Sequence, residues 1–272
     1  MGLIALVAVT AILVALAVLK TWTPPAQAAS PLPATSQTPG PPSPATPTAA
    51  APATQTPPAT PRAGLTGIGD ILNTPAGASV LVIGDDSGDA ADEWVATWAR
   101  DHLAQRATVS YHPWNRAAGT YADAVTLGSG TRAFTVWNAS SGSPTMTTEP
   151  GRAQQAWKDA DVVLLSYGHG RDAKLIGSQL DAVLAAVRGR DATVPVAVLL
   201  QNPERTATEA TQRDVTQAIK AWADAKGLPT VDIYGAFVAD PAARNALVQS
   251  DGSPTPQGSK LWAKTLAQAV SA

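Results

Sequence analysis

Short aliphatic runs alternate with longer amphipathic stretches along the C-terminal two-thirds of the chain. The aliphatic runs have the length of buried strands, and turn residues bound them at 79–84, 107–111, 133–137, 162–167, 194–200 and 230–234. Between them, apolar positions recur at helical spacing over 92–105, 172–188, 206–225 and 256–270. This alternation predicts a flavodoxin-like, three-layer α/β/α sandwich whose site lies at the carboxyl ends of the strands.

The first 63 residues have a different character. Residues 3–19 are apolar and uncharged, which predicts a signal peptide or membrane anchor over residues 1–20. Ala26-Gln27-Ala28 has the form of a signal-peptidase site, whereas Lys20 follows the apolar stretch, so the cleaved and anchored forms both stay open. Residues 21–63 are rich in Pro, Thr and Ala and predict a disordered linker. We therefore expect a domain over residues 64–272 that is secreted or membrane-anchored outside the cytoplasm.

Composition excludes several classes of function. The formal charge is -2 with only 19 basic residues and no basic cluster, so nucleic acid is not an expected partner. There is no cysteine and there are only three histidines, so we expect neither a metal nor another cofactor. The carboxylates of Asp85, Asp86, Asp89, Asp92 and Glu93 lack the spacing of a calcium loop and favour an acidic helix start.

Four polar segments stand where strands end or the last helix begins. They read Gly84-Asp85-Asp86-Ser87-Gly88, Asn138-Ala139-Ser140, Gly168-His169-Gly170 and Asp251-Gly252-Ser253-Pro254. In this order they resemble the four sequence blocks of the SGNH (GDSL) hydrolases, a family of serine esterases. The resemblance covers residues 76–272 and implies the SGNH hydrolase fold, with a mainly parallel five-stranded sheet.

The residues at the family's functional positions differ from the family pattern. There, the first block supplies the nucleophilic Ser, the second a Gly and the third an Asn of the oxyanion hole, and the last the His base. Matching the blocks residue by residue puts Asp86, Ala139, Gly170 and Ser253 at these four positions. Without a base of pKa near 7, a serine hydroxyl is a poor nucleophile. The resemblance therefore implies a catalytically impaired domain that binds a cell-envelope glycan or acylated ligand.

An active serine esterase or lipase with a rearranged site is the alternative hypothesis. Ser87 lies one residue beyond the nucleophile position, and His169 could serve as its base, oriented by Asp85 or Asp172. Such an enzyme would hydrolyse small acyl or acetyl esters. The other interpretation of His169 is a hydrogen-bonding loop residue.

The tryptophans divide into two groups. Trp94, Trp98 and Trp262 fall on apolar helical stripes and are predicted to be core. Trp114 and Trp137 lie at strand ends near the predicted cleft. Together with Asp85 and Asn138, these two residues are the predicted ligand-binding set.

Overall fold

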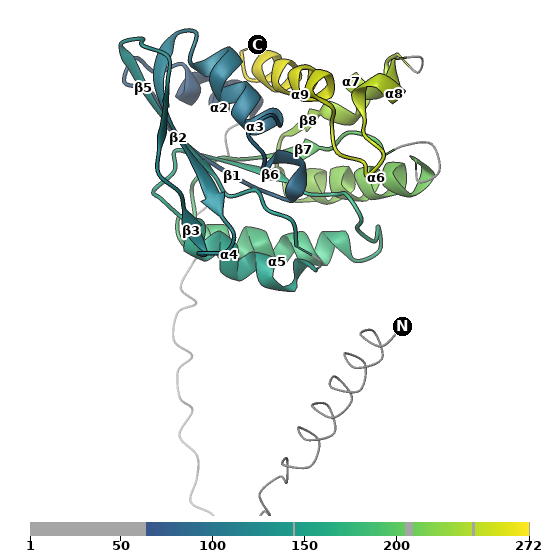
Figure 1. Ribbon diagram of the computed structural model, residues 1–272. Coiled ribbons are helices and arrows are strands. Elements are labelled where there is room, and N and C mark those ends of the chain that lie inside the picture. The colour runs from purple at the N-terminus through teal and green to yellow at the C-terminus, as the bar shows by residue number, and fades with distance from the viewer. Residues whose placement is uncertain (1–63, 144, 205–208, 241–242, 272) are drawn as a thin grey trace, which may run out of the picture. The chain divides into compact units, whose positions relative to one another are not determined.

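A computed structural model describes residues 64–143, 145–204, 209–240 and 243–271 (Figure 1). The predicted signal or anchor segment and the predicted linker lie outside these residues. Within the described ranges, no helix combines the length and the apolar character needed to cross a membrane.

The centre of the domain is a mainly parallel β-sheet. Its strand order is β3-β2-β5-β1-β6-β7-β8, with β4 also paired to β2. The parallel strands are β1 (Ser79–Gly84), β2 (Ala107–Asn115), β5 (Arg132–Asn138), β6 (Val162–Ser166), β7 (Val196–Leu200) and β8 (Thr230–Asp232). The short strands β3 (Thr120–Tyr121) and β4 (Val125–Leu127) run antiparallel to β2.

The predicted α/β sandwich is confirmed, but the predicted strand number was wrong. Within the described residues the sheet has eight strands rather than five. All six aliphatic runs form parallel strands. β2 extends beyond its predicted end and pairs there with β3, whereas β4 pairs with the predicted part of β2. The two strands that correspond to none of the six aliphatic runs, β3 and β4, are two and three residues long. They are too short to produce a recognisable alternation of apolar and polar positions.

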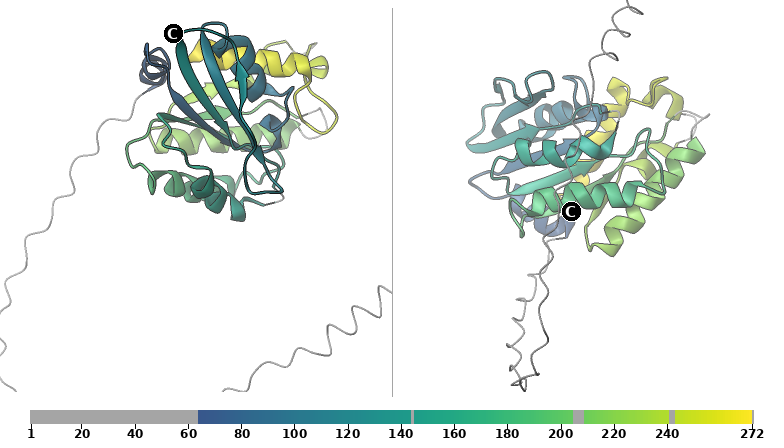
Figure 2. Two further views of the ribbon diagram at one scale, coloured as in Figure 1. Left: turned by 60° about the vertical axis from the view of Figure 1, so that its left-hand side comes forward. Right: turned by 90° about the horizontal axis from the view of Figure 1, so that it is seen from below.

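Helices cover both faces of the sheet (Figures 1 and 2). One layer contains α2 (Leu65–Leu72), α3 (Trp94–Trp98), α7 (Ile233–Val238), α8 (Arg244–Leu247) and α9 (Pro256–Ala269). The other contains α4 (Glu149–Ala156), α5 (Ile176–Arg188) and α6 (Glu209–Ala225). Two single 3₁₀ turns, η1 (Asp86–Gly88) and η3 (Met146–Thr148), follow β1 and β5.

The helix boundaries differ from the prediction in a few places. The helix expected over 92–105 begins at Trp94 and changes at Ala99 into a π-helical turn, η2 (Ala99–Leu103). The helix expected from residue 172 begins at Ile176. The short, polar α4 was not predicted because Pro150 and Gly151 lie in its first turn and its apolar stripe is weak.

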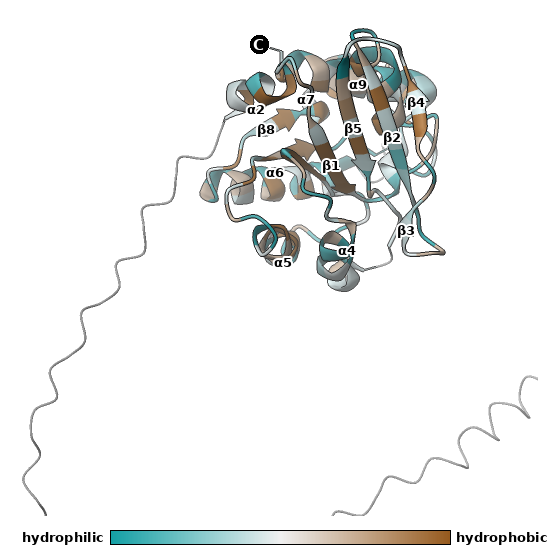
Figure 3. Ribbon diagram, turned by 90° about the vertical axis from the view of Figure 1, so that its left-hand side faces the viewer, coloured by the Kyte–Doolittle hydropathy of each residue, from teal (hydrophilic) through white to brown (hydrophobic). Residues whose placement is uncertain are grey.

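Alternate residues of each central strand enter different cores, which explains their continuous aliphatic sequences. In β1, Val80 and Val82 belong to the core under α3 and α9, whereas Leu81 and Ile83 belong to the core under α5. Figure 3 shows this concentration of hydrophobic residues along the central strands. The indole rings of Trp94 and Trp262 stack with centroids 5.1 Å apart and join α3 to α9. The predicted burial of the core tryptophans, including Trp98, is confirmed.

Candidate functional site

The polar segments that end the strands meet at the carboxyl edge of the sheet. Asn138 is the last residue of β5 that pairs with β1, and its Nδ2 donates to the carbonyl oxygen of Gly88 at 2.7 Å. The N–H of Gly168 donates to Asp85 Oδ2 at 3.2 Å. These bonds join the second and third segments to the first.

Asn202 joins the third segment to the last. His169 Nε2 donates to the carbonyl oxygen of Asn202 at 3.0 Å. Asn202 Nδ2 in turn donates to the carbonyl oxygen of Gly252 at 3.0 Å. The predicted proximity of the four segments is therefore confirmed, although bonds to Asn202, outside the four segments, complete the connection.

Asp85 is the central acceptor of this region. Its side chain belongs to a residue only 2% exposed. Besides the bond from Gly168, its Oδ1 accepts from the N–H of Ser87 at 3.2 Å, from Ser87 Oγ at 2.7 Å and from Gln201 Nε2 at 2.8 Å. The carboxylate therefore faces the protein interior, and protein donors occupy both of its oxygens.

Ser87 and His169 have separate partners. Ser87 is 2% exposed, and its Oγ both donates to Asp85 and accepts from Gln201 Nε2 at 3.1 Å. The backbone N–H of His169 donates to Gln201 Oε1 at 2.9 Å, while its ring is bonded to Asn202. Gln201 thus contacts both predicted catalytic residues, and the imidazole is directed to a main-chain carbonyl.

The sequence did not identify Gln201 and Asn202 as site residues. Both are buried and directly follow the aliphatic strand β7. The sequence did carry one signal for them: two polar residues follow the carboxyl end of a buried parallel strand. Such strand ends gather at one edge of the sheet, where the site lies.

Asp86 is exposed and lies beside Gly142. A Cβ atom on Gly142 would be 3.0 Å from Asp86 Oδ2. Ala139 is fully buried, and its N–H donates to the carbonyl oxygen of Val82 at 2.8 Å, continuing the β5–β1 ladder. The assignment of Ala139 to the oxyanion position stays a prediction; its amide is bonded within the sheet, and Gly142 is the glycine that lies beside Asp86.

The two remaining family positions carry no catalytic group. Gly170 is exposed and has φ +65°, a left-handed conformation that favours glycine. Ser253 belongs to a tight turn in which its N–H donates to Asp251 Oδ1 at 3.0 Å and its carbonyl oxygen accepts from the N–H of Gln249 at 2.7 Å.

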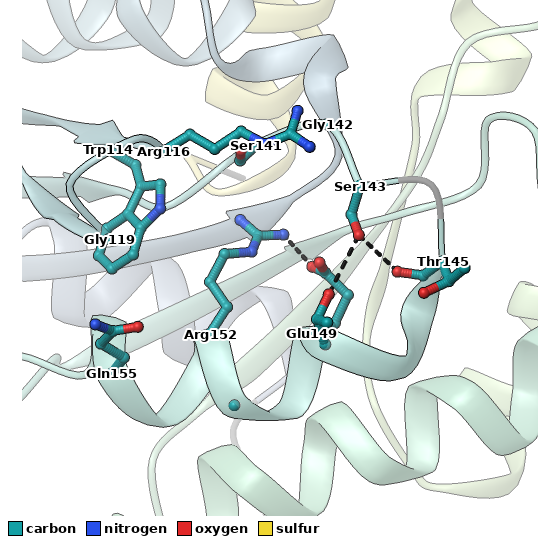
Figure 4. Close-up of a pocket in the computed structure, with 12 residues that line it drawn as sticks. Trp114, Arg116, Gly119, Ser141, Gly142, Ser143, Thr145, Glu149, Arg152 and Gln155 are labelled. Carbon is teal, nitrogen blue, oxygen red and sulfur yellow. Dashed lines mark hydrogen bonds and ion pairs between the residues drawn. The ribbon is translucent and has the colours of Figure 1, made fainter. Parts of the chain in front are cut away.

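A pocket of about 470 Å³ opens beside Gly142, between the β2–β3 hairpin, the segment after β5 and α4 (Figure 4). Trp114 lines it. Trp137 instead packs in an aromatic cluster, where it stacks on His112 with ring centroids 3.9 Å apart and contacts Tyr121. Asn138 is buried and bonded to Gly88 and Tyr111. Of the four predicted ligand-binding residues, Trp114 is therefore the one that lines this pocket.

A buried ion pair forms one wall of the pocket. Arg152 is paired with Glu149, and its guanidinium donates to the carbonyl oxygens of Gly84, at 2.8 Å, and Ala139. Tyr167 Oη donates to Glu149 Oε2 at 2.5 Å. Burial raises the pKa of Tyr167 well above its usual value. The pair ties α4 to the carboxyl ends of β1 and β5.

Two acidic side chains in the segment after β1 have raised pKa values. Burial raises the pKa of Asp89, whose Oδ2 accepts from the N–H of Gly142 at 3.4 Å. Burial also raises the pKa of Glu93 to about 7, although a bond from the N–H of Ala90 partly offsets this. In the part of the chain that the structure describes, no cluster of three or more His, Cys, Asp or Glu residues could hold a metal ion.

The raised pKa of Glu93 predicts a pH-dependent stability. Between pH 4.5 and about 7 the folded state keeps a proton that the unfolded state releases, so the free energy of unfolding falls as pH rises through this range. Glu93→Gln should therefore show a smaller loss of Tm between pH 5 and pH 8 than the wild type. Asp70→Asn is the control because Asp70 is exposed and is not among the groups that raise the pKa of Glu93. Parallel Tm profiles for wild type and Glu93→Gln would contradict the prediction.

Solved structures with similar folds are known. A lipase/acylhydrolase from Enterococcus faecalis matches with a TM-score of 0.53 and 13% identity over 71% of this chain and 95% of its own. LAE5, an α/β hydrolase enzyme from the metagenome of Lake Arreo, matches with a TM-score of 0.51 and 18% identity over 72% of this chain and 96% of its own. TesA matches with a TM-score of 0.50 and 15% identity over 71% of this chain and 97% of its own.

Comparisons of sequence alone find no relative: no protein-family model matches the chain, and no curated protein does. The fold is recognised from its three-dimensional arrangement, namely the parallel sheet, the two helical layers and the loops that meet at the carboxyl edge. The domain over the described residues has the fold of the SGNH (GDSL) hydrolases.

Proposed function

We propose that this chain is a catalytically impaired SGNH-fold domain, held outside the cytoplasm, that binds a cell-envelope ligand, either a glycan or an acylated polymer. The single observation that carries the proposal is the position of Ser87. Its hydroxyl lies 2.7 Å from Asp85 in a residue that is 2% exposed. A nucleophile must reach the ester carbon, and this hydroxyl has no open face from which to do so.

The groups around Ser87 support the same conclusion. Asp85 accepts a hydrogen bond from the Ser87 hydroxyl, but its two oxygens also accept hydrogen bonds from Gln201 and Gly168. These additional bonds occupy both oxygens of the carboxylate with protein donors. The imidazole of His169 is bonded through Nε2 to the carbonyl oxygen of Asn202, whereas the Ser87 hydroxyl is bonded to Asp85 and Gln201.

The exposed part of the site lacks the groups that acyl transfer needs. Asp86 places a carboxylate beside Gly142, where a developing oxyanion would be repelled. Gly170 has no side chain to donate a hydrogen bond, and loss of one such donor costs about 10²–10³ in rate. Ser253 offers no base at the last position.

The pocket beside Gly142 supports a binding role. It is open, combines Trp114 with polar residues, and at about 470 Å³ falls in the size range of small-molecule sites. The apolar stretch over residues 3–19 and the Pro-rich sequence after it support placement at the cell envelope. That placement also makes an envelope polymer an accessible partner.

Hydrolysis of p-nitrophenyl acetate by the full chain tests the proposal. We expect a rate equal to the buffer background for wild type, for Ser87→Ala and for Ser143→Ala, a control serine on the pocket wall. A fluorophosphonate that labels serine nucleophiles should leave all three proteins unlabelled. Turnover and labelling that are present in wild type and Ser143→Ala but lost in Ser87→Ala would establish the rearranged esterase instead.

A further inference from the structure

We infer that the pocket beside Gly142 is a carbohydrate site that takes a neutral, hydroxyl-rich glycan against Trp114. This inference rests on the proposed function, which leaves a glycan and an acylated ligand as alternatives. Three properties of the pocket favour the glycan: the side chains that line it, the pairing of its charges and the position of its aromatic wall.

The lining contains no aliphatic side chain. Of its twelve residues, Trp114 alone has a large apolar surface, and the others are glycine, serine, threonine, glutamine, arginine and glutamate. An acyl chain binds by moving its methylene groups from water to an apolar surface, and each group so buried stabilises the complex. One indole cannot cover such a chain. The pocket therefore offers an acyl ligand little binding free energy.

The cations of the pocket already have anionic neighbours. Arg152 is paired with Glu149 and donates to two main-chain carbonyl oxygens. Arg116 is exposed and lies close enough to Asp89 to offset part of the rise in pKa that burial causes there. Asp86 adds a further negative charge beside Gly142. An anionic ligand would thus approach arginines that have carboxylates nearby, whereas a neutral one needs no charge partner.

The aromatic wall is fixed in place. Trp114 meets Tyr121 edge to face, with ring centroids 5.0 Å apart. Tyr121 Oη donates to the carbonyl oxygen of Ala156 at 2.8 Å and thereby ties the hairpin to α4. The indole that lines the pocket is therefore held before any ligand arrives. Such preorganisation reduces the entropic cost of binding.

Polar groups line the same pocket as this aromatic surface. A pyranose has an apolar C–H face that stacks on an indole and a rim of hydroxyl groups that need donors and acceptors. Gln155 projects its exposed amide toward the hairpin, 3.3 Å from where a Cβ on Gly119 would lie (Figure 4). The hydroxyls of Ser143 and Thr148 lie 3.3 Å apart on another wall. This combination matches both parts of a neutral sugar.

Isothermal titration of the full chain in mild detergent tests the inference. The probes are maltotriose, cellotriose and chitotriose as neutral glycans, trigalacturonate as an anionic glycan, and octanoate as an acyl chain. We expect at least one neutral trisaccharide to bind, and neither trigalacturonate nor octanoate to bind in this pocket. Trp114→Ala should weaken that binding about tenfold, the loss expected for an aromatic contact of about 1.4 kcal/mol.

A pair of adjacent glutamines provides the matched control. Gln155→Ala should weaken binding several-fold, while Gln154→Ala, an exposed neighbour on α4 outside the pocket, should leave it unchanged. Because both positions are exposed, neither variant threatens the fold. This comparison decides the result even if Trp114→Ala does not fold.

The outcomes separate this inference from the proposed function. Octanoate or trigalacturonate binding that Gln155→Ala weakens would overturn the inference of a neutral glycan and leave a binding domain. No binding by any of the three neutral probes, or binding that neither variant changes, would also overturn the glycan site. Ester hydrolysis that depends on Ser87 would instead overturn the proposed function.

Discussion

Replacing Glu149 by alanine should lower the free energy of unfolding by about 3–5 kcal/mol, because it leaves the buried guanidinium of Arg152 without its counter-charge. The two side chains are only 2% and 11% exposed. The loss should appear as a lower midpoint in urea denaturation followed by circular dichroism. Glu149 also accepts from Tyr167, and that donor would be left unpaired as well.

Asp224→Ala is the matched control for this prediction. Asp224 forms an ion pair one helical turn from Lys220, but their side chains are 59% and 54% exposed. Its removal should cost less than about 1 kcal/mol. The double variant Glu149→Leu, Arg152→Met should recover part of the lost stability because it removes the unpaired charge. Equal midpoints for Glu149→Ala and Asp224→Ala would contradict the prediction.

Replacing Asp85 by alanine should also destabilise the protein strongly, by about 3–5 kcal/mol. The substitution removes the acceptor for donors from Ser87, Gly168 and Gln201, all of them buried. Unpaired buried donors keep the cost of their desolvation without compensation. Urea denaturation of the variant measures the effect.

The adjacent carboxylate supplies the control. Asp86 is exposed, so Asp86→Ala should change stability by less than about 0.5 kcal/mol. If Asp85→Ala proved as stable as Asp86→Ala, the bonds to Asp85 would not contribute to the fold. Asp85→Asn keeps the size of the side chain and one oxygen acceptor. Its free energy of unfolding should lie between those of Asp85→Ala and Asp86→Ala.

Much of the fold could be predicted because the central strands carry their own signal. A strand such as β1 is buried on both faces, so its sequence is a continuous aliphatic run that is hard to mistake. The strands β3 and β4 were missed because their residues are largely exposed and pair only with β2. Their pairing depends on the path of the chain after Asn115, and the local pattern of apolar and polar residues does not predict that path.

The site was less predictable because the sequence does not show whether a polar side chain at a strand end faces the interior or the solvent. Asp85 and Asp86 are neighbours of the same type, yet the first faces the interior and the second faces solvent. Gln201 lies 116 residues from Asp85 and became visible as its partner only in three dimensions. Ala139 was assigned to the oxyanion position from the match of Asn138-Ala139-Ser140 to the second block, whereas Gly142 is the glycine that lies beside Asp86.

The bonds that join the four loops have a consequence for how such a domain can evolve. They come from Asp85, Asn138, Gln201 and Asn202, and none of these occupies the position of a nucleophile or a base. Substitutions at positions 86, 170 and 253 can therefore accumulate without loosening the edge of the sheet. The residues that hold the architecture and the positions that carry the family's chemistry are therefore different residues in this domain, so a change in the second set need not disturb the first.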